Sequence, residues 1–264
     1  MKKLSILFFP LFFISISSQE NIKYQKPSKE ILDLVEFERP PSILYDENKN
    51  FMLFLFRDNY KSIAELSAKE LRLGGLRIDP KTNIGSRVTY YNNVKIRNLK
   101  NQKSEITQVK GLPKNPKLSN ISWSPDQKRI ALTNTTETGV ELWVLELENG
   151  SVTKLTESNL NSNIGSVINW FSDSENMLVK MISNNRRPLI DTNKIVPDGP
   201  TISTNFGEKA QNRTYQDLLK NKFDEHNFEQ LSTSTIYKVS IDGSVKKWMD
   251  DGMYRTCLLY TSDA

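Results

Sequence analysis

The sequence predicts an all-β fold, an incomplete β-propeller of about three four-stranded blades with short helical insertions. The first observation is the stretch 119–156, in which four short apolar segments are separated by turn residues. The second is its third segment, 140–147, which is apolar on both faces, so each face needs a neighbouring layer, as in stacked blades. The third is repetition of a pattern in which an aromatic residue is followed by a turn and an Asp. The pattern occurs at Asp126, again 47 residues later at Asp173, and earlier in the chain at Asp46. Periods of about 40 to 50 residues are typical of propellers and argue against the alternative, a two-layer sandwich.

Turn residues set the boundaries of the expected strands. Pro125 fits the second position of a turn because its ring fixes φ, and the carboxylate of Asp126 can accept a bond from the backbone. Asn149-Gly150 and Asp242-Gly243 predict hairpins, since these residues tolerate positive φ. The expected strands are 51–56, 76–78, 94–99, 105–109, 121–124, 129–133, 140–147, 151–155, 177–182, 234–241 and 244–249.

Short helices are expected between the strands, over residues 28–36, 63–71 and 215–220. Ser28 is a favourable N-cap for the first, and Arg39-Pro40-Pro41 stops it before the first blade. Gly74-Gly75 ends the second. The third lies in the irregular segment 183–230, and long irregular loops in compact domains are often functional.

The N-terminus has the pattern of a secretory signal peptide. Lys2-Lys3 precede an apolar run at 4–16, and serines follow at the expected cleavage site before Gln19. The run is too short to span a bilayer, which needs about 20 residues. We therefore expect residues 1–18 to be removed and the protein to be exported, periplasmic or extracellular, with no membrane attachment afterwards; the alternative is an apolar first strand of the domain.

Composition excludes several classes of function. The net charge is +5, and the basic residues are interspersed with acidic ones, so no basic stripe indicates nucleic-acid binding. Cys257 is the single cysteine, which excludes an intrachain disulfide and a cysteine-based metal site. We expect no metal and no cofactor.

Seven motifs carry a resemblance to a known family. They are Tyr24-Gln25-Lys26-Pro27, Ile31-Leu32-Asp33, Arg39-Pro40-Pro41, Ser62-Ile63-Ala64-Glu65-Leu66, Glu70-Leu71-Arg72-Leu73-Gly74-Gly75-Leu76-Arg77-Ile78, Gly139-Val140-Glu141-Leu142-Trp143 and Arg213-Thr214-Tyr215-Gln216-Asp217-Leu218-Leu219. On these residues the chain resembles the N-terminal propeller portion of prolyl-oligopeptidase-family serine peptidases, in the glutamyl endopeptidase branch. Phe171 departs from the pattern where a turn proline is expected, and Gly74 where an alanine is expected.

The resemblance implies a propeller that gates peptide access to a C-terminal α/β-hydrolase domain with a Ser, Asp and His. This sequence contains no Gly-x-Ser-x-Gly motif, the turn that exposes the nucleophile in such a domain, so no catalytic residue is carried over. We expect this chain to be inactive alone and to meet its peptide substrate only through the missing catalytic domain. The alternative is an independent TolB-like propeller that serves as a periplasmic protein-binding module. The oligomeric state and the cleavage-site preference stay open.

Candidate site residues are few. His226 is the single histidine, and its place beside Asp224 and Glu225 is more typical of a solvated loop than of acid–base or metal chemistry. Because the chain resembles glutamyl-preferring enzymes, Arg186, Arg187 or Arg213 could bind a substrate carboxylate with two hydrogen bonds. A surface salt bridge is the alternative for each arginine.

The C-terminal octapeptide 257–264 differs from the rest of the chain. It contains the single cysteine, the Lys- and Asn-rich composition stops before it, and it resembles the translation of a sequencing-library adapter. We expect residues 19–256 to be the N-terminal part of a propeller domain, and Met253-Tyr254-Arg255 to begin a further blade. Propellers close with at least four blades, so the terminal blades of an open arc expose apolar faces and favour aggregation.

Overall fold

The computed structural model describes residues 25–101, 103–191 and 217–255. Between 191 and 217 it also describes residues 194, 195, 199, 204, 206 and 207. The chain divides into two compact units, 1–38 and 39–264. The first contains α1 (Lys29–Val35), which confirms the first predicted helix; it begins after Ser28, whose backbone is extended. The predicted signal peptide 1–18 and the octapeptide 257–264 lie outside the described residues.

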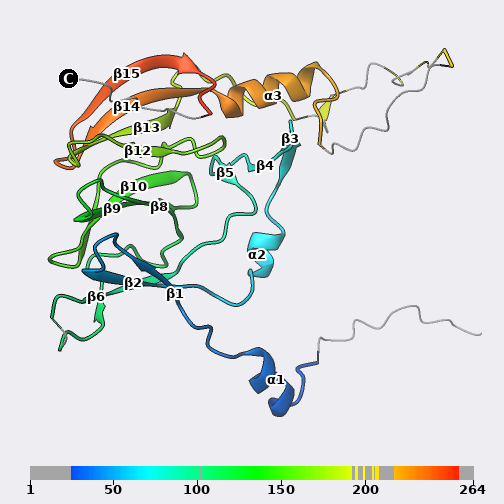
Figure 1. Cartoon of the computed structure of the whole chain (residues 1–264). Helices are drawn as coiled ribbons and strands as arrows, with labels where there is room; N and C mark the ends of the chain where they lie inside the picture. The colour runs from blue at the N-terminus through cyan, green and yellow to red at the C-terminus, as the bar shows by residue number, and fades with distance from the viewer. Residues whose placement is uncertain are drawn as a thin grey trace, which may run out of the picture. The chain divides into compact units, whose positions relative to one another are not determined.

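The second unit contains three four-stranded antiparallel sheets, in chain order, which we call blades 1, 2 and 3 (Figure 1). Blade 1 is β1 (Ser42–Tyr45), β2 (Phe51–Phe56), β6 (Asn93–Asn98) and β7 (Thr107–Gln108); blade 2 is β8 (Leu118–Trp123), β9 (Arg129–Thr135), β10 (Val140–Glu146) and β11 (Ser151–Lys154); blade 3 is β12 (Ile168–Trp170), β13 (Asn176–Ile182), β14 (Ser234–Ser240) and β15 (Val245–Gly252). Neighbouring strands pair antiparallel throughout. The predicted propeller arc of three four-stranded blades is confirmed.

The predicted turn between the first two strands of each blade recurs with the same chemistry. In blade 2 the backbone N–H of Gln127 donates to the carbonyl of Ser124 at 2.9 Å, and Asp126 Oδ1 accepts from the backbone N–H of Lys128 at 3.1 Å. In blade 3 Asp173 Oδ1 accepts from two backbone N–H groups, at 2.9 and 3.0 Å. In blade 1 Asp46 Oδ1 accepts from Phe51 at 2.6 Å. The repeated Asp therefore accepts backbone hydrogen bonds in the turn of all three blades, although the bond in blade 1 spans five residues and those in blades 2 and 3 span two or three.

Both faces of β10 are buried, as its apolar pattern predicts. Leu145 and Leu147 lie in a core shared with blade 1, whereas Val140, Leu142 and Val144 lie in a core shared with blade 3. Leu142 and Leu145 are both 0% exposed. Blade 2 is thus packed between its two neighbours. This arrangement excludes a sheet that has one buried face and one solvent-exposed face, as in a two-layer sandwich.

One carboxylate, that of Glu141, is buried near the start of β10 in blade 2. Glu141 accepts hydrogen bonds from Trp143 Nε1 at 2.9 Å and Asn134 Nδ2 at 3.1 Å, and Lys154 Nζ lies 3.0 Å from its other oxygen. Burial acts to raise the pKa of the Glu141 carboxyl, but the hydrogen bonds and the Lys154 ammonium outweigh it and hold the pKa below the ordinary value of 4.5.

We expect this carboxylate to make unfolding pH-dependent. A pKa that is lower in the folded chain than in the unfolded chain adds stability above pH ~4.5 that disappears as the pH falls. Glu141→Gln should lower the free energy of unfolding by about 2 kcal/mol at pH 7 and by much less at pH 3. Urea unfolding at both pH values measures this, with Glu148→Gln as an exposed control. An equal loss at pH 3 and pH 7 would contradict the assignment.

The connection after the second strand of each blade lies at one end of the arc. In blade 2 this connection contains only residues 136–139. In blades 1 and 3 it is much longer, and we call residues 57–92 the blade 1 insertion and residues 183–233 the blade 3 insertion. The blade 1 insertion contains α2 (Ile63–Leu66) and a three-stranded sheet of β3 (Leu71–Leu73), β4 (Leu76–Asp79) and β5 (Ile84–Gly85); the blade 3 insertion contains α3 (Lys222–Ser232). Figure 1 shows these elements beside one another.

The second predicted helix, 63–71, is wrong in its second half. The helix ends at Leu66, after a capping box in which Ser62 and Glu65 satisfy each other's backbone N–H groups. Residues 71–73 instead form β3, because Gly74 and Gly75, with φ of 57° and 80°, allow a tight hairpin to β4. Sheet pairing overrides the local helical pattern here.

The third predicted helix is wrong. Residues 217–220 are not helical, and 215 and 216 lie outside the described residues. The helix is α3, whose N-cap Asn221 accepts hydrogen bonds from two backbone N–H groups, with Asp224 and Glu225 in the first turn. These N-terminal signals are present in the sequence, so the expectation of an irregular segment up to residue 230 is wrong from Lys222 onward.

The two insertions pack against each other. Leu73 and Ile78 from the blade 1 insertion share a buried cluster with Leu231 of α3, together with the partly buried Phe228 and Leu189. We call these five residues the insertion core. Polar contacts extend the cluster. Gly75 N–H donates to the Asp217 carbonyl at 3.1 Å, and Arg77 pairs with Asp217 at 3.3 Å. Asn161 Nδ2 donates to the carbonyls of Leu231 and Thr233. The insertions thereby link blade 1 to blade 3 beyond the short connection of blade 2.

Apolar side chains are exposed on the outermost strand of blade 3. Val245, Trp248 and Met249 are 45%, 50% and 41% exposed, and the Trp248 ring meets Phe171 edge-on at 5.7 Å. Blade 1 exposes Ile43 and Tyr45 on β1. These surfaces agree with the exposed apolar faces expected of an open arc, and aggregation through them stays a prediction. None of the described helices is long and apolar enough to cross a membrane.

Candidate functional site

Two of the three predicted arginines, Arg186 and Arg187, lie among the described residues and line the same cavity. Arg186 Nη1 donates to Asn83 Oδ1 across the two insertions, and burial lowers the pKa of the Arg186 guanidinium. Arg187 is exposed, and its Nη2 lies 3.5 Å from Glu229 Oε2. Both line a cavity of about 200 Å³ that also contains Asp251. Arg213 lies outside the described residues, so a role in carboxylate binding stays a prediction for all three arginines.

His226 lies apart from that cavity's lining. Its Nε2 is 3.1 Å from the carbonyl oxygen of Pro188. Within the described ranges, no group of three His, Cys, Asp or Glu side chains is arranged to hold a metal ion. The contact of His226 is with the backbone of its own insertion.

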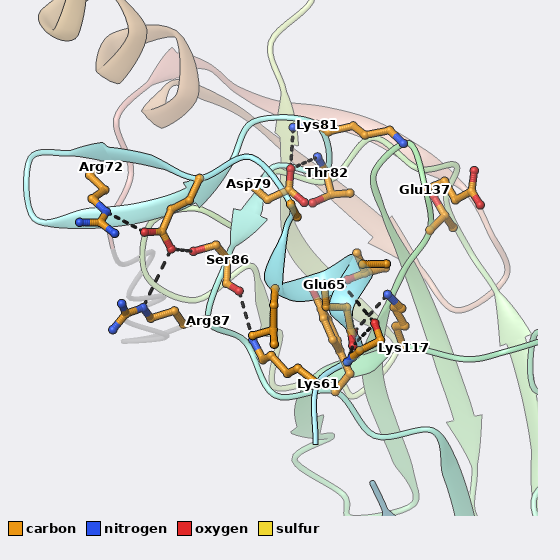
Figure 2. Close-up of a pocket in the computed structure, with 18 residues that line it drawn as sticks. Lys61, Glu65, Arg72, Asp79, Lys81, Thr82, Ser86, Arg87, Lys117 and Glu137 are labelled. Carbon is orange, nitrogen blue, oxygen red and sulfur yellow. Dashed lines mark hydrogen bonds and ion pairs between the residues drawn. The ribbon is translucent and has the colours of Figure 1, made fainter. Parts of the chain in front are cut away.

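A larger cleft, of about 550 Å³, lies between the blade 1 insertion and the end of blade 2, and is our candidate site (Figure 2). Its walls come from α2, from the β3–β5 sheet and from the residues that precede β8 and follow β9. The lining residues are Lys61, Ser62, Ala64, Glu65, Leu66, Ala68, Glu70, Arg72, Asp79, Lys81, Thr82, Ser86, Arg87, Tyr90, Lys117, Thr135, Thr136 and Glu137. The lining includes no histidine and no cysteine.

Glu70 is held by several donors in one wall. Ser86 Oγ donates to Glu70 Oε2 at 2.5 Å, and Arg72 Nε and Arg77 Nη1 lie 2.9 and 3.2 Å from Oε1. The hydrogen bond from Ser86 is the main reason that the pKa of the Glu70 carboxyl is lowered, and burial opposes it. Glu70 is therefore an ionised carboxylate whose charge is already compensated.

Glu65, on α2, is satisfied in a similar way. It accepts from the backbone N–H of Ser62 at 2.9 Å, the main cause of its lowered pKa, and Lys117 Nζ lies 3.3 Å away. Lys117 also lies over the ring of Tyr90, 5.7 Å from its centroid. Burial raises the pKa of the Tyr90 hydroxyl, so this side chain is neutral at pH 7.

The remaining lining charges are less compensated. Lys61 Nζ donates to the backbone carbonyl of Ser86 at 3.2 Å, and Arg87 lies 4.0 Å from Glu70, which two other arginines already contact. Among the described residues, Lys81 has no ion pair within 4.0 Å, and Figure 2 shows it at the rim beside Asp79. A cleft of this kind can bind a charged, polar ligand, but it offers no nucleophile with an oriented base.

This cleft was not predicted from the sequence. Its lining comes from segments that are up to 76 residues apart, from Lys61 to Glu137, and no local pattern shows that they meet. The motif at Ser62–Leu66 predicts a helix and carries part of the family resemblance, but it does not indicate a cleft. Pairing of β3 with β4 and packing against blade 2 create the site, and both are tertiary effects.

Thr82 has a buried hydroxyl in the cleft wall with no hydrogen-bond partner among the described residues. The residue is 7% exposed. Because an unpaired buried hydroxyl is unfavourable, Thr82→Val should raise the free energy of unfolding by about 1 kcal/mol. Thr156→Val is the matched control, since its equally buried hydroxyl accepts from Leu142 N–H and donates to the Glu157 carbonyl at 3.0 Å each, and it should lose stability. Chemical denaturation of both variants measures this; a loss for Thr82→Val would contradict it.

Comparison with known proteins places the fold and the site in context. No family model matches the chain. It is 31% identical over 240 residues to a probable chloroplastic glutamyl endopeptidase of Arabidopsis thaliana and 29% identical over 235 residues to the probable chloroplastic enzyme of Oryza sativa subsp. japonica. These matches cover 85% and 84% of this chain but only 24% and 25% of the relatives, so the chain spans about a quarter of their length.

Solved structures give a weaker match. The acylaminoacyl peptidase of Pyrococcus horikoshii aligns with 83% of this chain and 25% of its own, at 19% identity and a TM-score of 0.38. The assignment therefore depends on the curated relatives and on the seven motifs, several of which lie in the insertions. Together, the curated relatives and the seven motifs support a propeller portion of the prolyl-oligopeptidase type, similar to the corresponding quarter of glutamyl endopeptidases.

Proposed function

We propose that this chain is the propeller region of an exported serine peptidase, and that the propeller limits access to a catalytic α/β-hydrolase domain so that only short peptides are cleaved. The observation that carries the proposal is the extent of the similarity to glutamyl endopeptidases. The match covers 85% of the chain and leaves 15% unmatched. Because the two insertions together make up about a third of the chain, the unmatched part is too small to contain them, and the match includes much of their sequence. Generic propeller similarity would not extend into them.

The catalytic residues would have to come from outside the 264 residues. A serine nucleophile needs an oriented base, and His226, the single histidine, contacts the Pro188 carbonyl. The chain lacks the Gly-x-Ser-x-Gly turn as well. The alternative, an independent TolB-like binding module, has no specific observation in its favour.

Activity of the intact gene product tests the proposal. A protein expressed from the complete coding region should hydrolyse short glutamyl peptides and react with a serine-directed fluorophosphonate label. The 264-residue chain should do neither, as judged by mass spectrometry of the same peptides with His226→Ala as a control. Turnover by the chain itself, lost in His226→Ala, would overturn the proposal, and so would an intact product that neither cleaves nor labels.

Export is part of the proposal and has its own test. The basic start and apolar run at 4–16 support a signal peptide. Expression in a bacterial host should deliver the protein to the periplasm, with Gln19 as its first residue by N-terminal sequencing. Retention in the cytoplasm with an intact N-terminus would exclude export.

A further inference from the structure

We propose that the outward side of α2, in the blade 1 insertion, is the surface on which the α/β-hydrolase domain of the intact peptidase docks. The surface is formed by Ile63 and Leu66, and we call it the α2 face. The inference deepens the proposed function and rests on it for the existence of that domain. The surface itself is inferred from the burial, the bonds and the position of α2.

The burial of α2 is inverted. The Glu65 side chain is only 29% exposed, whereas Ile63 and Leu66 are 86% and 71% exposed. Ile63 and Leu66 are three residues apart, so they are neighbours on the helix surface. A surface helix normally turns its apolar side to the core and its polar side to water. Because α2 does the reverse, its apolar side is open to a partner.

The inverted helix is held in place by bonds on its polar side. Ser62 Oγ accepts from the backbone N–H of Glu65 at 3.2 Å, and Glu65 Oε2 accepts from the backbone N–H of Ser62 at 2.9 Å. Lys117 Nζ lies 3.3 Å from the other carboxylate oxygen of Glu65 (Figure 2). These bonds fix the direction in which α2 faces. Ile63 and Leu66 therefore lose little conformational freedom when a partner covers them.

α2 lies at the end of the arc through which the chain enters and leaves the three blades, which we call the insertion end. Ser42, the first residue of β1, pairs with Leu55, next to the point where the blade 1 insertion begins. Gly252, the last residue of β15, pairs with Ser234, where the blade 3 insertion returns to the sheet. A domain joined to either connection is thus held near α2 at a high effective concentration.

This position favours a domain of the same polypeptide over a second copy of the chain. A tethered domain meets the α2 face in an intramolecular step, whereas a second copy must be brought from solution. The curated relatives are about four times as long as the part of them that this chain matches, which leaves room for such a domain. Since the α2 face is apolar, the surface that covers it is expected to be apolar as well.

Cysteine labelling tests the inference. Ile63→Cys is introduced into the 264-residue chain and into the intact gene product. Glu148→Cys is the control, because it lies in the exposed turn between β10 and β11, at the opposite end of blade 2 from the insertions. The rate of reaction with iodoacetamide at each introduced cysteine is followed by peptide mass spectrometry.

The two proteins should differ at the α2 face alone. In the 264-residue chain both cysteines should react at similar rates, because both positions are exposed. In the intact product Ile63→Cys should react at least about 10-fold more slowly, because a covered side chain reacts only when the contact opens. Glu148→Cys should react as before. If Ile63→Cys loses the circular dichroism signal of the parent protein, Leu66→Cys is read in its place.

Three results would overturn the inference. Equal rates at the α2 face in both proteins would show that nothing outside the chain covers it. Slow labelling of the α2 face in the 264-residue chain, relative to Glu148→Cys, would mean that the chain itself already covers it. A labelling rate that falls as the concentration of the chain rises would assign the α2 face to a second copy.

The labelling assay needs no turnover, so it separates the inference from the proposed function. Protection of the α2 face in an intact product that cleaves no peptide would contradict the proposed function and leave the docking surface in place. Cleavage by an intact product whose α2 face reacts as fast as in the chain would do the reverse.

Discussion

Leu142→Ala and Leu145→Ala should each lower the free energy of unfolding by about 3 kcal/mol, the usual cost of removing a fully buried leucine side chain. The two side chains project from opposite faces of β10, and both are 0% exposed. Leu142 packs in the core between blades 2 and 3, and Leu145 in the core between blades 1 and 2. Each substitution therefore leaves a cavity in a different core.

Urea unfolding measures both losses, and Leu66→Ala, at a 71% exposed leucine, should change stability by less than about 0.5 kcal/mol. The comparison decides between architectures. A sheet with one wet face, as in a two-layer sandwich, would show a large loss for one leucine and a near-zero change for the other. Equal losses at both positions are what stacked blades require.

Leu231→Ala should have a comparable effect on the insertions, with a loss of about 3 kcal/mol in the free energy of opening them. Leu231 is 0% exposed in the insertion core, against Leu73 and Ile78 of the blade 1 insertion. Removing it takes away the buried contact that joins the insertions, while the cores between the blades keep all their side chains.

Hydrogen exchange measures this effect residue by residue. Amides of β3, β4 and α3 should exchange faster in Leu231→Ala, whereas amides of β9 and β10 should change far less. Leu218→Ala, at a 39% exposed leucine near the same helix, is the control and should leave exchange nearly unchanged. Uniform acceleration in all three blades would mean that the insertions do not form a separable unit.

The blades were predictable from sequence because their signals are local. Strand alternation, the Asp-containing turns and the Asn149-Gly150 hairpin each depend on a few neighbouring residues, and Gly150 does adopt a φ of 64°. The two buried faces of β10 could be inferred in the same way, since a strand apolar on both sides must be covered twice. Stacking of blades is the simplest structure that satisfies both faces.

The insertions could not be predicted to the same degree. Residues 71–73 carry a helical pattern but become β3, because pairing with β4 and packing against α3 decide their conformation. Helix α3 was not predicted although Asn221 is a good N-cap, because Asn and Pro are frequent in the segment that precedes it. The cleft depends on where these elements meet, which no single segment encodes.

The size dependence of cleavage tests the central claim, that this chain is the propeller that restricts access in a glutamyl peptidase, most directly. The intact gene product would be given an eight-residue glutamyl peptide and the same eight residues within a folded protein and within an unfolded chain of about 100 residues. We predict a kcat/KM at least 100-fold higher for the free peptide than for either longer substrate. Similar kcat/KM values for all three substrates would contradict the claim.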